Sequence, residues 1–313
     1  MNNLFAMVTM KSSNFYTNFA IKTFFKNTLL DESDEFLLID NDGNDVKNFS
    51  SYKKIKITKN EKPLSFAENV NQGIEKAIKN KKNLIFLNND IIFTKGWFKP
   101  MQIEEKDISI PVCNQLFAYN SDCGKLKLKF LMKFEDFNEN YYLLNKIVEK
   151  HKLKFKVGLK FQTHLMPFYC FKIPYKILFD VGKFDTSFGK GGGEDIDYRI
   201  RCANKNFDVN FLTDSYLLHF QGKSTWDGVE SPKETEKRNK IYIDAFKKKG
   251  VDKVSKQFQA ELTDLQEKIK SFVSIAADTQ KVYSAHFKFE PIVGEIYFLY
   301  QGKKNSFLSL VEP

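Results

Sequence analysis

The stretch NLIFLNNDIIF, residues 83–93, carries the strongest strand signal in the chain and indicates the class of fold. Apolar residues fill it on both sides of a polar centre formed by Asn88, Asn89 and Asp90. A nearly continuous apolar run of this length is typical of a strand covered on both faces, which is how strands lie in a parallel α/β sheet. The sequence therefore predicts one long buried strand with a polar site inside it.

Strands and helices alternate on the N-terminal side of this stretch. Ser65 and Glu68 have the spacing of a capping box, which marks the start of an amphipathic helix. The remaining expected elements are strands at 4–9, at 35–45 running into a turn, and at 55–59, with helices at about 15–30 and 64–80. This alternation predicts an α/β fold, a Rossmann-like and mostly parallel sheet with helices on both faces.

The sequence after residue 93 carries weaker signals of secondary structure. Alternating segments at 125–130 and 152–157 indicate half-exposed strands around a helix at 138–150, and a glycine-rich loop leads into a helix from Glu194 to about Asn206. A strand then ends at His219, and a basic helix at 233–249 closes the unit at Gly250.

The pattern changes beyond Gly250. Apolar residues recur at alternating spacings of four and three, which is typical of a coiled-coil seam: Phe258, Leu262, Leu265, Ile269, Phe272 and Ala276. The last segment is expected to form a β-hairpin turning around residues 301–305. We therefore expect a main domain at 1–250 and an interaction module at 251–313, with a homodimer through the C-terminal helix.

Charge and cysteine usage restrict the class of protein. The 49 Lys and Arg against 39 Asp and Glu give a net charge of +10, which favours anionic partners such as phosphates, nucleic acid or a membrane surface. Residues 150–179 hold seven lysines and no acid, and an anion-binding face and a plain solvated face explain them equally well. The four cysteines show no zinc or disulfide spacing, so we expect reduced thiols. With no apolar run long enough to span a membrane, we expect a cytoplasmic protein, with peripheral membrane contact left open.

Three acidic positions follow expected strands, where open α/β sheets gather their ligands. Asp40 is placed to accept a hydrogen bond from a nucleobase or ribose, although a turn built by Asp40 itself explains it nearly as well. Burying Asp90 as an ion requires a partner, and a hard cation carrying diphosphate oxygens would serve; capping of a neighbouring helix is the alternative. His219 would be structural if it stood alone, but beside Asp90 it is a candidate ligand.

The glycine-rich segment GKGGGEDIDYRIR, residues 189–201, holds the third position. Glu194, Asp195 and Asp197 lie in the first helical turn, where the helix dipole by itself would favour acids. The glycines let the backbone approach a ligand closely, and a carboxylate above a cleft is what a general base requires. Arg199 or Arg201 is expected to orient these acids.

The order of these motifs over residues 3–250 resembles the GT-A fold glycosyltransferases, especially the inverting family 2 enzymes. The segment GGEDID is also similar to the β-1,4-galactosyltransferase group. The matching segments are AMVT (6–9), DNDGND (40–45), NQGI (71–74), LNND (87–90), VGKFDTSF (181–188) with GGGEDIDYRIR (191–201), and HFQGKST (219–225).

The resemblance implies a set of roles. Asp195 would be the catalytic base, and Glu194 would bind the acceptor or orient the loop. Asp90 and His219 would hold Mn²⁺ or Mg²⁺ on the donor diphosphate. The nucleotide-sugar donor, expected to be UDP-linked, would lie against Thr9, Asp40, Asn71 and Asn88.

The expected function is therefore inverting, metal-dependent hexosyl transfer from a nucleotide sugar to a glycan, lipid-linked or other anionic acceptor, as in polysaccharide biosynthesis. The alternative is a catalytically inactive GT-A-like protein whose lysines bind nucleic acid or an anionic glycan. An intact set of Asp90, Glu194, Asp195 and His219 favours the enzyme.

Overall fold

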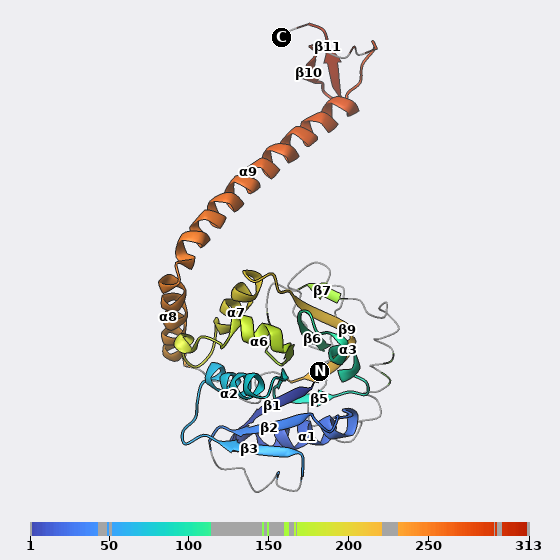
Figure 1. Ribbon diagram of the computed structural model, residues 1–313. Helices are drawn as coiled ribbons and strands as arrows, with labels where there is room; N and C mark the ends of the chain where they lie inside the picture. The colour runs from blue at the N-terminus through green and yellow to red at the C-terminus, as the bar shows by residue number, and fades with distance from the viewer. Residues whose placement is uncertain are drawn as a thin grey trace. The chain divides into compact units, whose positions relative to one another are not determined.

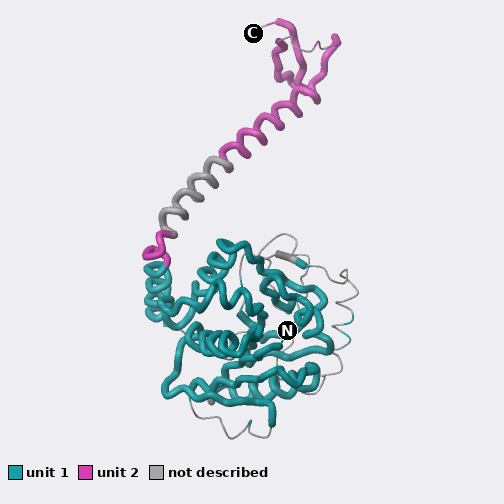
Figure 2. Tube along the Cα trace, in the orientation of Figure 1, with its two compact units in different colours: residues 1–245 teal, residues 246–313 magenta. Residues whose placement is uncertain are grey.

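The computed structural model describes residues 2–42, 49, 52–113, 146, 149, 160–162, 166, 168–220, 231–290, 292 and 296–311, with the backbone alone at 11, 161–162 and 251–265. The expected strands at 125–130 and 152–157 lie outside these residues, as does most of the helix expected at 138–150. The described chain forms two compact units, residues 1–245 and 246–313 (Figure 2). The functions expected of the two parts stay predictions.

Nine strands of the first unit form one sheet, in the order β3-β2-β1-β4-β8-β6-β9-β5 with β7 beside β9 (Figure 1). Six of these strands run in one direction, and β5, β7 and β8 oppose them, so the expected mostly parallel α/β sheet is confirmed. The strands are β1 Asn3–Thr9, β2 Glu35–Asp40, β3 Ile55–Lys59, β4 Asn83–Leu87, β5 Ile91–Phe93, β6 Ile108–Cys113, β7 Lys160–Gln162, β8 Cys170–Ile173 and β9 Val209–His219.

The helices of this unit follow the expected alternation closely. Helix α2 begins at the predicted capping box, where the Ser65 hydroxyl accepts from the Glu68 amide and the Glu68 carboxylate accepts from the Ser65 amide. The helices are α1 Asn14–Asn27, α2 Phe66–Lys79, α3 Phe98–Ile103, α6 Tyr175–Val181, α7 Glu194–Ala203 and α8 Pro232–Lys248, with short 3₁₀ turns at Lys11–Ser13 and Thr186–Phe188.

The prediction of one continuous strand over residues 83–93 is wrong. The stretch forms two strands, β4 between β1 and β8 and β5 beside β9 at the far edge of the sheet. The polar centre ends β4, because the side chain of Asn89 turns to the hydroxyls of Ser13 and Thr17 instead of continuing the alternation of a strand. Asp90 therefore stands in a connection that joins distant parts of one sheet.

Side-chain alternation along β1 shows how the sheet is covered on both faces. Phe5 packs edge-to-face on Phe24 of α1, with ring centroids 5.0 Å apart. Its neighbour Ala6 points to the other face, where a Cβ on Gly73 of α2 would stand only 3.3 Å from the Ala6 methyl. Helices α1 and α2 thus cover opposite faces, as right-handed crossovers in opposite directions, from β1 to β2 and from β3 to β4, require.

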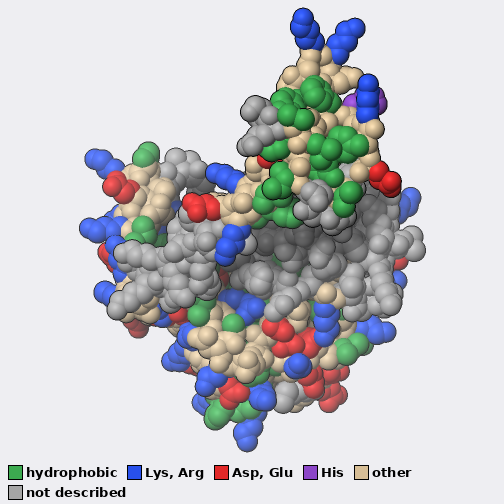
Figure 3. Space-filling view, turned by 90° about the horizontal axis from the view of Figure 1, so that it is seen from above, with side chains coloured by type: hydrophobic (Ala, Val, Ile, Leu, Met, Phe, Trp, Pro, Cys, Tyr) green, Lys and Arg blue, Asp and Glu red, His purple; other side chains and the backbone are tan. Residues whose placement is uncertain are grey.

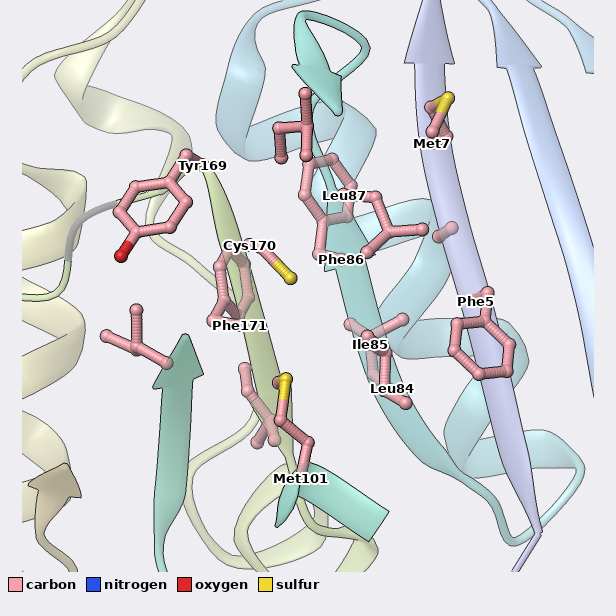
Figure 4. Close-up of a cluster of buried hydrophobic side chains, with 14 of the residues drawn as sticks. Phe5, Met7, Leu84, Ile85, Phe86, Leu87, Met101, Tyr169, Cys170 and Phe171 are labelled. Atoms are coloured by element: carbon pink, nitrogen blue, oxygen red, sulfur yellow. The ribbon is translucent and has the colours of Figure 1, made fainter. Parts of the chain in front are cut away.

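The core runs without interruption across the middle of the sheet (Figure 4). Phe86 of β4 and Phe171 of β8 are opposite one another in the antiparallel pair of these strands, and their rings stack at a centroid distance of 5.6 Å. Cys113, Cys170 and Cys202 are buried, as expected of core thiols, and Cys123 lies outside the described residues. Dense aromatic packing of this kind holds the strand ends in fixed positions.

Lys172 is a fully buried lysine on β8. Its ammonium donates to the carbonyl oxygens of Met101 at 2.8 Å and of Glu104 at 2.5 Å, which are otherwise open acceptors at the end of α3. Burial lowers the pKa of this ammonium to about 8. Lys172 belonged to the lysine-rich stretch for which a solvated or anion-binding face was expected, and for this residue that expectation is wrong.

The second unit contains α9, Val251–Ser284, and a two-stranded antiparallel sheet of β10, Phe298–Gln301, and β11, Ser306–Ser309. The amide of Gly302 donates to the carbonyl of Asn305 at 3.0 Å and closes the turn. The predicted C-terminal helix and β-hairpin are therefore confirmed. Within the described residues, no helix is both long and apolar enough to cross a membrane.

Candidate functional site

The order in which strands are added to the sheet reverses between β1 and β4, which are parallel neighbours. Strands β2 and β3 lie on one side of β1, while β4 follows on the other. In open α/β sheets such a switch point leaves a crevice at the carboxyl ends of the strands, where ligands bind. A cleft lies at this place, lined among others by Val8, Met10, Asn41, Asn88 and Asn89.

Asn41 anchors one wall of this cleft. Its side-chain oxygen accepts from the Leu64 amide at 2.9 Å and from the side-chain amides of Asn60 at 2.8 Å and Asn69 at 3.0 Å. This network fixes the loop after β3 against the end of β2. The neighbouring Asp40 is fully buried and stands opposite Thr9 in the register of β1 and β2, so two predicted donor-site residues lie side by side.

Asn89 and the hydroxyls beside it form a second network, which sequence reasoning missed. The side-chain amide of Asn89 donates to the hydroxyls of Ser13 and Thr17, at 2.8 Å each, and the Thr9 hydroxyl lies 2.8 Å from that of Thr17. The side-chain oxygen of Asn89 is buried and finds no donor in the described part of the chain. A buried acceptor in this condition is unusual and fits a place where a ligand or water donates.

Asp90 and His219 meet at the end of the sheet. Antiparallel pairing of β5 and β9 places Ile91 opposite His219, so that Asp90 Oδ1 lies 3.3 Å from His219 Nε2. The imidazole stacks on the ring of Tyr169 with centroids 5.1 Å apart. The structure thus brings together the two predicted metal ligands, from positions 129 residues apart in the sequence.

Burial and charge act against one another at His219. Desolvation opposes protonation of the imidazole, but hydrogen bonds to Asp90 and Cys113 and the charge of Asp90 outweigh it and raise its pKa to about 9. An imidazolium cannot bind a metal, so a bound cation would displace this proton and take its place beside the carboxylate.

The donor set of this pair is suited to Mn²⁺ or Mg²⁺ with further ligands from a substrate. Carboxylate oxygen and imidazole nitrogen are ordinary ligands for such ions, and Mg²⁺ in particular is often held by one or two carboxylates together with substrate phosphates. Among the described residues, no group of three or more His, Cys, Asp or Glu side chains is arranged to hold a metal. A cation here would therefore depend on oxygens that the substrate supplies.

The glycine-rich loop leads into α7 through three unusual backbone conformations. Gly191, Gly192 and Gly193 all have positive φ, at 145°, 117° and 99°. At Gly193 an added Cβ would stand 2.3 Å from the ring of Tyr242, so both the conformation and the space require glycine. The loop therefore holds its shape by packing against α8.

Backbone amides hold the two acids that follow the loop. Glu194 accepts from the amide of Gly192, and Asp195 accepts from the amide of Ile196 at 2.8 Å. Burial raises the pKa of both carboxyls, against the opposing effect of these hydrogen bonds. A carboxylate with a raised pKa is a stronger base than a solvated one, which suits general-base catalysis.

The third acid of the turn has a structural role. Asp197 accepts from Arg201 Nε at 2.9 Å, and the same guanidinium donates to the carbonyls of Val181 and Lys183. The expected pairing of an arginine with these acids is therefore confirmed for Arg201 and Asp197. This pair attaches α7 to the end of α6.

Asn71 of α2 is bound to the segment before the glycine loop and is not among the residues that line the cleft. Its side chain accepts from the Phe184 amide at 2.8 Å and donates to the Phe184 carbonyl at 2.9 Å. Both groups of the side-chain amide are thus occupied in holding the segment before the glycine loop. Asn88 lines the cleft, and its backbone amide donates to the carbonyl oxygen of Tyr169.

Helix α8 supplies residues that sequence reasoning overlooked. Ile241 and Tyr242 contact Gly189 and Gly193, and the guanidinium of Arg238 lies 3.4 Å from the Cβ position of Gly192. The charge of Arg238 lowers the pKa of Glu194 against the larger effect of burial. The spacing of these three residues on one helical face was a usable signal, but nothing in the sequence indicated which loop they would meet.

These features define an α/β unit with a crevice at the switch point of its sheet. No protein-family model matches the sequence, and no curated protein is similar to it. Among solved structures the chain is similar to GalNAc-T7, crystallised with UDP, GalNAc and Mn²⁺, with a TM-score of 0.54 and 15% identity over 74% of this chain. The match spans 46% of the GalNAc-T7 chain. The fold is therefore that of the GT-A glycosyltransferases.

Two further solved structures have lower scores. TarS of S. aureus matches 76% of this chain and 38% of its own, with a TM-score of 0.49 and 13% identity. The mannosyltransferase PcManGT from Pyrobaculum calidifontis, in complex with GDP-Man and Mn²⁺, matches 69% of this chain and 56% of its own, with a TM-score of 0.45 and 10% identity.

Proposed function

We propose that this protein is an inverting, metal-dependent glycosyltransferase that moves a hexosyl group from a nucleoside-diphosphate sugar to a hydroxyl of a glycan, lipid-linked or other anionic acceptor. The observation that carries the proposal is the joint presence of the Asp90 and His219 pair at the carboxyl edge of a GT-A fold and, at the glycine loop, of the buried Glu194 and the half-buried Asp195, whose pKa values are raised. A purely structural ion pair would need no second acidic site.

Asp90 and His219 would hold a divalent cation, which when bound neutralises charge that develops on the leaving diphosphate. The donor nucleotide would lie in the cleft beside Asn88. Thr9 and Asp40 are buried next to the lining residues Val8 and Asn41 and would act indirectly, by supporting the wall of the cleft. Asn71 would act indirectly, by fixing the segment that leads into the glycine loop.

Asp195 would take the proton from the acceptor hydroxyl. As that proton moves to the carboxylate, the acceptor oxygen forms its bond to the anomeric carbon, and the bond from that carbon to the diphosphate oxygen breaks with its electron pair. Attack from the face opposite the leaving group inverts the configuration. Glu194, fixed by the Gly192 amide, would orient the loop or bind the acceptor.

The lysine-rich segment 150–179 gives limited support for an anionic acceptor. Of its three described lysines, Lys172 is buried, Lys160 pairs with Glu104, and Lys176 lies over the ring of Phe207. The other four lie outside the described residues. The anionic class of acceptor therefore follows from the net charge of +10 alone.

A thermal-shift series tests the proposal. The purified protein is melted with UDP, GDP, dTDP or CMP, with and without Mn²⁺, because a ligand that binds only the folded state raises the melting temperature. We expect a shift with one nucleoside diphosphate that depends on the metal and disappears in Asp90→Asn. The exposed Asp278, on α9, gives a matched control as Asp278→Asn.

No shift with any nucleotide would contradict the proposal. In that case the alternative, a basic GT-A-like binding protein, predicts salt-sensitive binding of nucleic acid or an anionic glycan without added metal.

A further inference from the structure

Helix α9 exposes a long apolar surface. It has 34 residues, so it is about 50 Å long. Every residue from 266 to 284 is exposed, including Ile269 at 54% and Phe272 at 72%. Hydrophobic side chains are visible on the surface of the C-terminal unit in Figure 3. Most of the stability of a helix in a protein comes from packing its apolar face against other elements. No other element covers the apolar face of α9 over residues 266–284, whose side chains are described.

Six apolar residues of α9 have heptad spacing. They fall on the two inner positions of a seven-residue repeat, conventionally called a and d, which face a partner helix. These positions hold Phe258, Leu262, Leu265, Ile269, Phe272 and Ala276. The stripe thus runs continuously over almost three repeats within one helix.

Charged residues avoid this stripe. Residues 251–284 contain ten charged side chains, and none stands at an inner position. Seven occupy the three outer positions of the repeat: Lys253, Lys256, Asp264, Glu267, Lys270, Asp278 and Lys281. Such segregation is expected of a helix that buries one face and exposes the other to solvent. A helix exposed to solvent on all sides would not need it.

The positions that flank the inner ones, conventionally called e and g, do not carry charges that would repel a second identical helix. They carry only three charges, Asp252, Glu261 and Lys268, and the last two are opposite in sign. Two copies are therefore not repelled along the seam. The hairpin of β10 and β11 meets the helix only near its end, where Ala285 and Leu308 are buried.

We propose that α9 pairs with α9 of a second copy of this chain to form a two-stranded coiled coil. A second copy offers an apolar stripe of the same length and spacing. Leu265 at d followed by Ile269 at a is the arrangement that favours a two-stranded coil. The inference depends on the C-terminal unit alone and stands or falls independently of the proposed transferase activity.

Sedimentation equilibrium of the full chain is the direct test. Across about 1–100 µM we expect a reversible equilibrium that reaches twice the monomer mass of 36.6 kDa. A monomer throughout this range overturns the proposal, and so does a mass of three or more chains.

Two double variants locate the interface. Ile269→Lys with Phe272→Lys places two charges on the inner positions and should weaken dimerisation at least about a hundredfold. Ser271→Lys with Ser274→Lys places the same charges on outer positions of the same turns and should leave the dimer intact. Equal behaviour of the two variants overturns the proposal.

A substitution that strengthens dimerisation tests the interface in a way that unfolding of the variant cannot mimic. Ala276 occupies an inner position and Ala277 the adjacent outer one, and both are exposed alanines in the structure. Ala276→Leu should tighten the dimer about tenfold or more, because each helix then buries extra apolar surface, whereas Ala277→Leu should not. An equal effect of both changes contradicts the placement of the seam.

Discussion

Carboxylates occur at both parts of the candidate site, in opposite surroundings. Asp90 is buried beside His219, and the imidazole has its pKa raised to about 9 by that contact against desolvation. Asp195 is held by backbone amides, and burial raises its own pKa. The first arrangement favours the charged form of the pair, while the second disfavours charge on the acid.

The difference assigns separate chemical tasks to one residue type. A carboxylate beside an imidazole offers two ligands to a cation, whereas a carboxyl with a raised pKa suits the exchange of a proton. The experiments below test whether Asp90 and Asp195 differ in this way.

The largest expected effect is that of Asp195→Asn. Loss of a general base lowers turnover by about 10²–10⁴-fold, while the metal-dependent melting shift with nucleotide stays. The exposed Asp180, at the end of α6, serves as control through Asp180→Asn, which should keep full activity. Unchanged turnover in Asp195→Asn would refute its assignment as the base.

Gly193→Ala should destabilise the first unit by about 3 kcal/mol, through the strain of a positive φ and the collision with Tyr242. Gly182 also has a positive φ, but no atom lies within 4 Å of an added Cβ, so Gly182→Ala isolates the strain. Urea denaturation measures both. If Tyr242→Ala fails to recover part of the loss caused by Gly193→Ala, packing against α8 is not what fixes the loop.

Asp90→Asn and His219→Gln should each weaken Mn²⁺ binding about tenfold or more, since even residues that only support metal ligands contribute this much. Titration calorimetry with Mn²⁺ and the nucleotide should show both affinities falling together. His286→Gln, at an exposed histidine of the C-terminal unit, should change neither. A loss of nucleotide affinity without loss of metal affinity would separate Asp90 from the cation.

The smallest effect is on stability and depends on pH. Burial raises the pKa of Glu194, so the folded state holds this proton more tightly than the unfolded state. Ionisation therefore costs stability as the pH rises through the folded pKa. Glu194→Gln should raise the free energy of unfolding near neutral pH and give no gain below the ordinary carboxyl pKa of 4.5. Glu75→Gln, in an exposed ion pair, should show no such dependence, and equal curves for both would refute burial as the cause.

Much of the fold was predictable because its signals are local. Helix α2 begins at Ser65, as its capping box indicates, and β1, β2 and β3 lie where short apolar or alternating runs predict them. The break inside residues 83–93 was not predictable, because hydroxyls of Ser13 and Thr17, more than seventy residues away, compete for the side chain of Asn89.

The site was predictable to a lesser degree. Asp90 and His219 could be paired because both were expected at neighbouring strand ends, and the structure joins them. Asn71 could not be separated from the strand-end residues, since its bonds to Phe184 depend on how α2 meets the segment after α6. The contacts of Tyr242 with the glycine loop are tertiary and leave no local pattern.

The polar break between β4 and β5 also has a meaning for the newly made chain. Asp90 is the only charged residue within 83–93, so without it the segment would carry no charge. Short segments with high β-propensity and no charge are the ones that aggregate before folding is complete, and a charge within or beside them suppresses this. The carboxylate proposed to hold the cation in the folded protein is thus also the single charge between two apolar runs of the newly made chain.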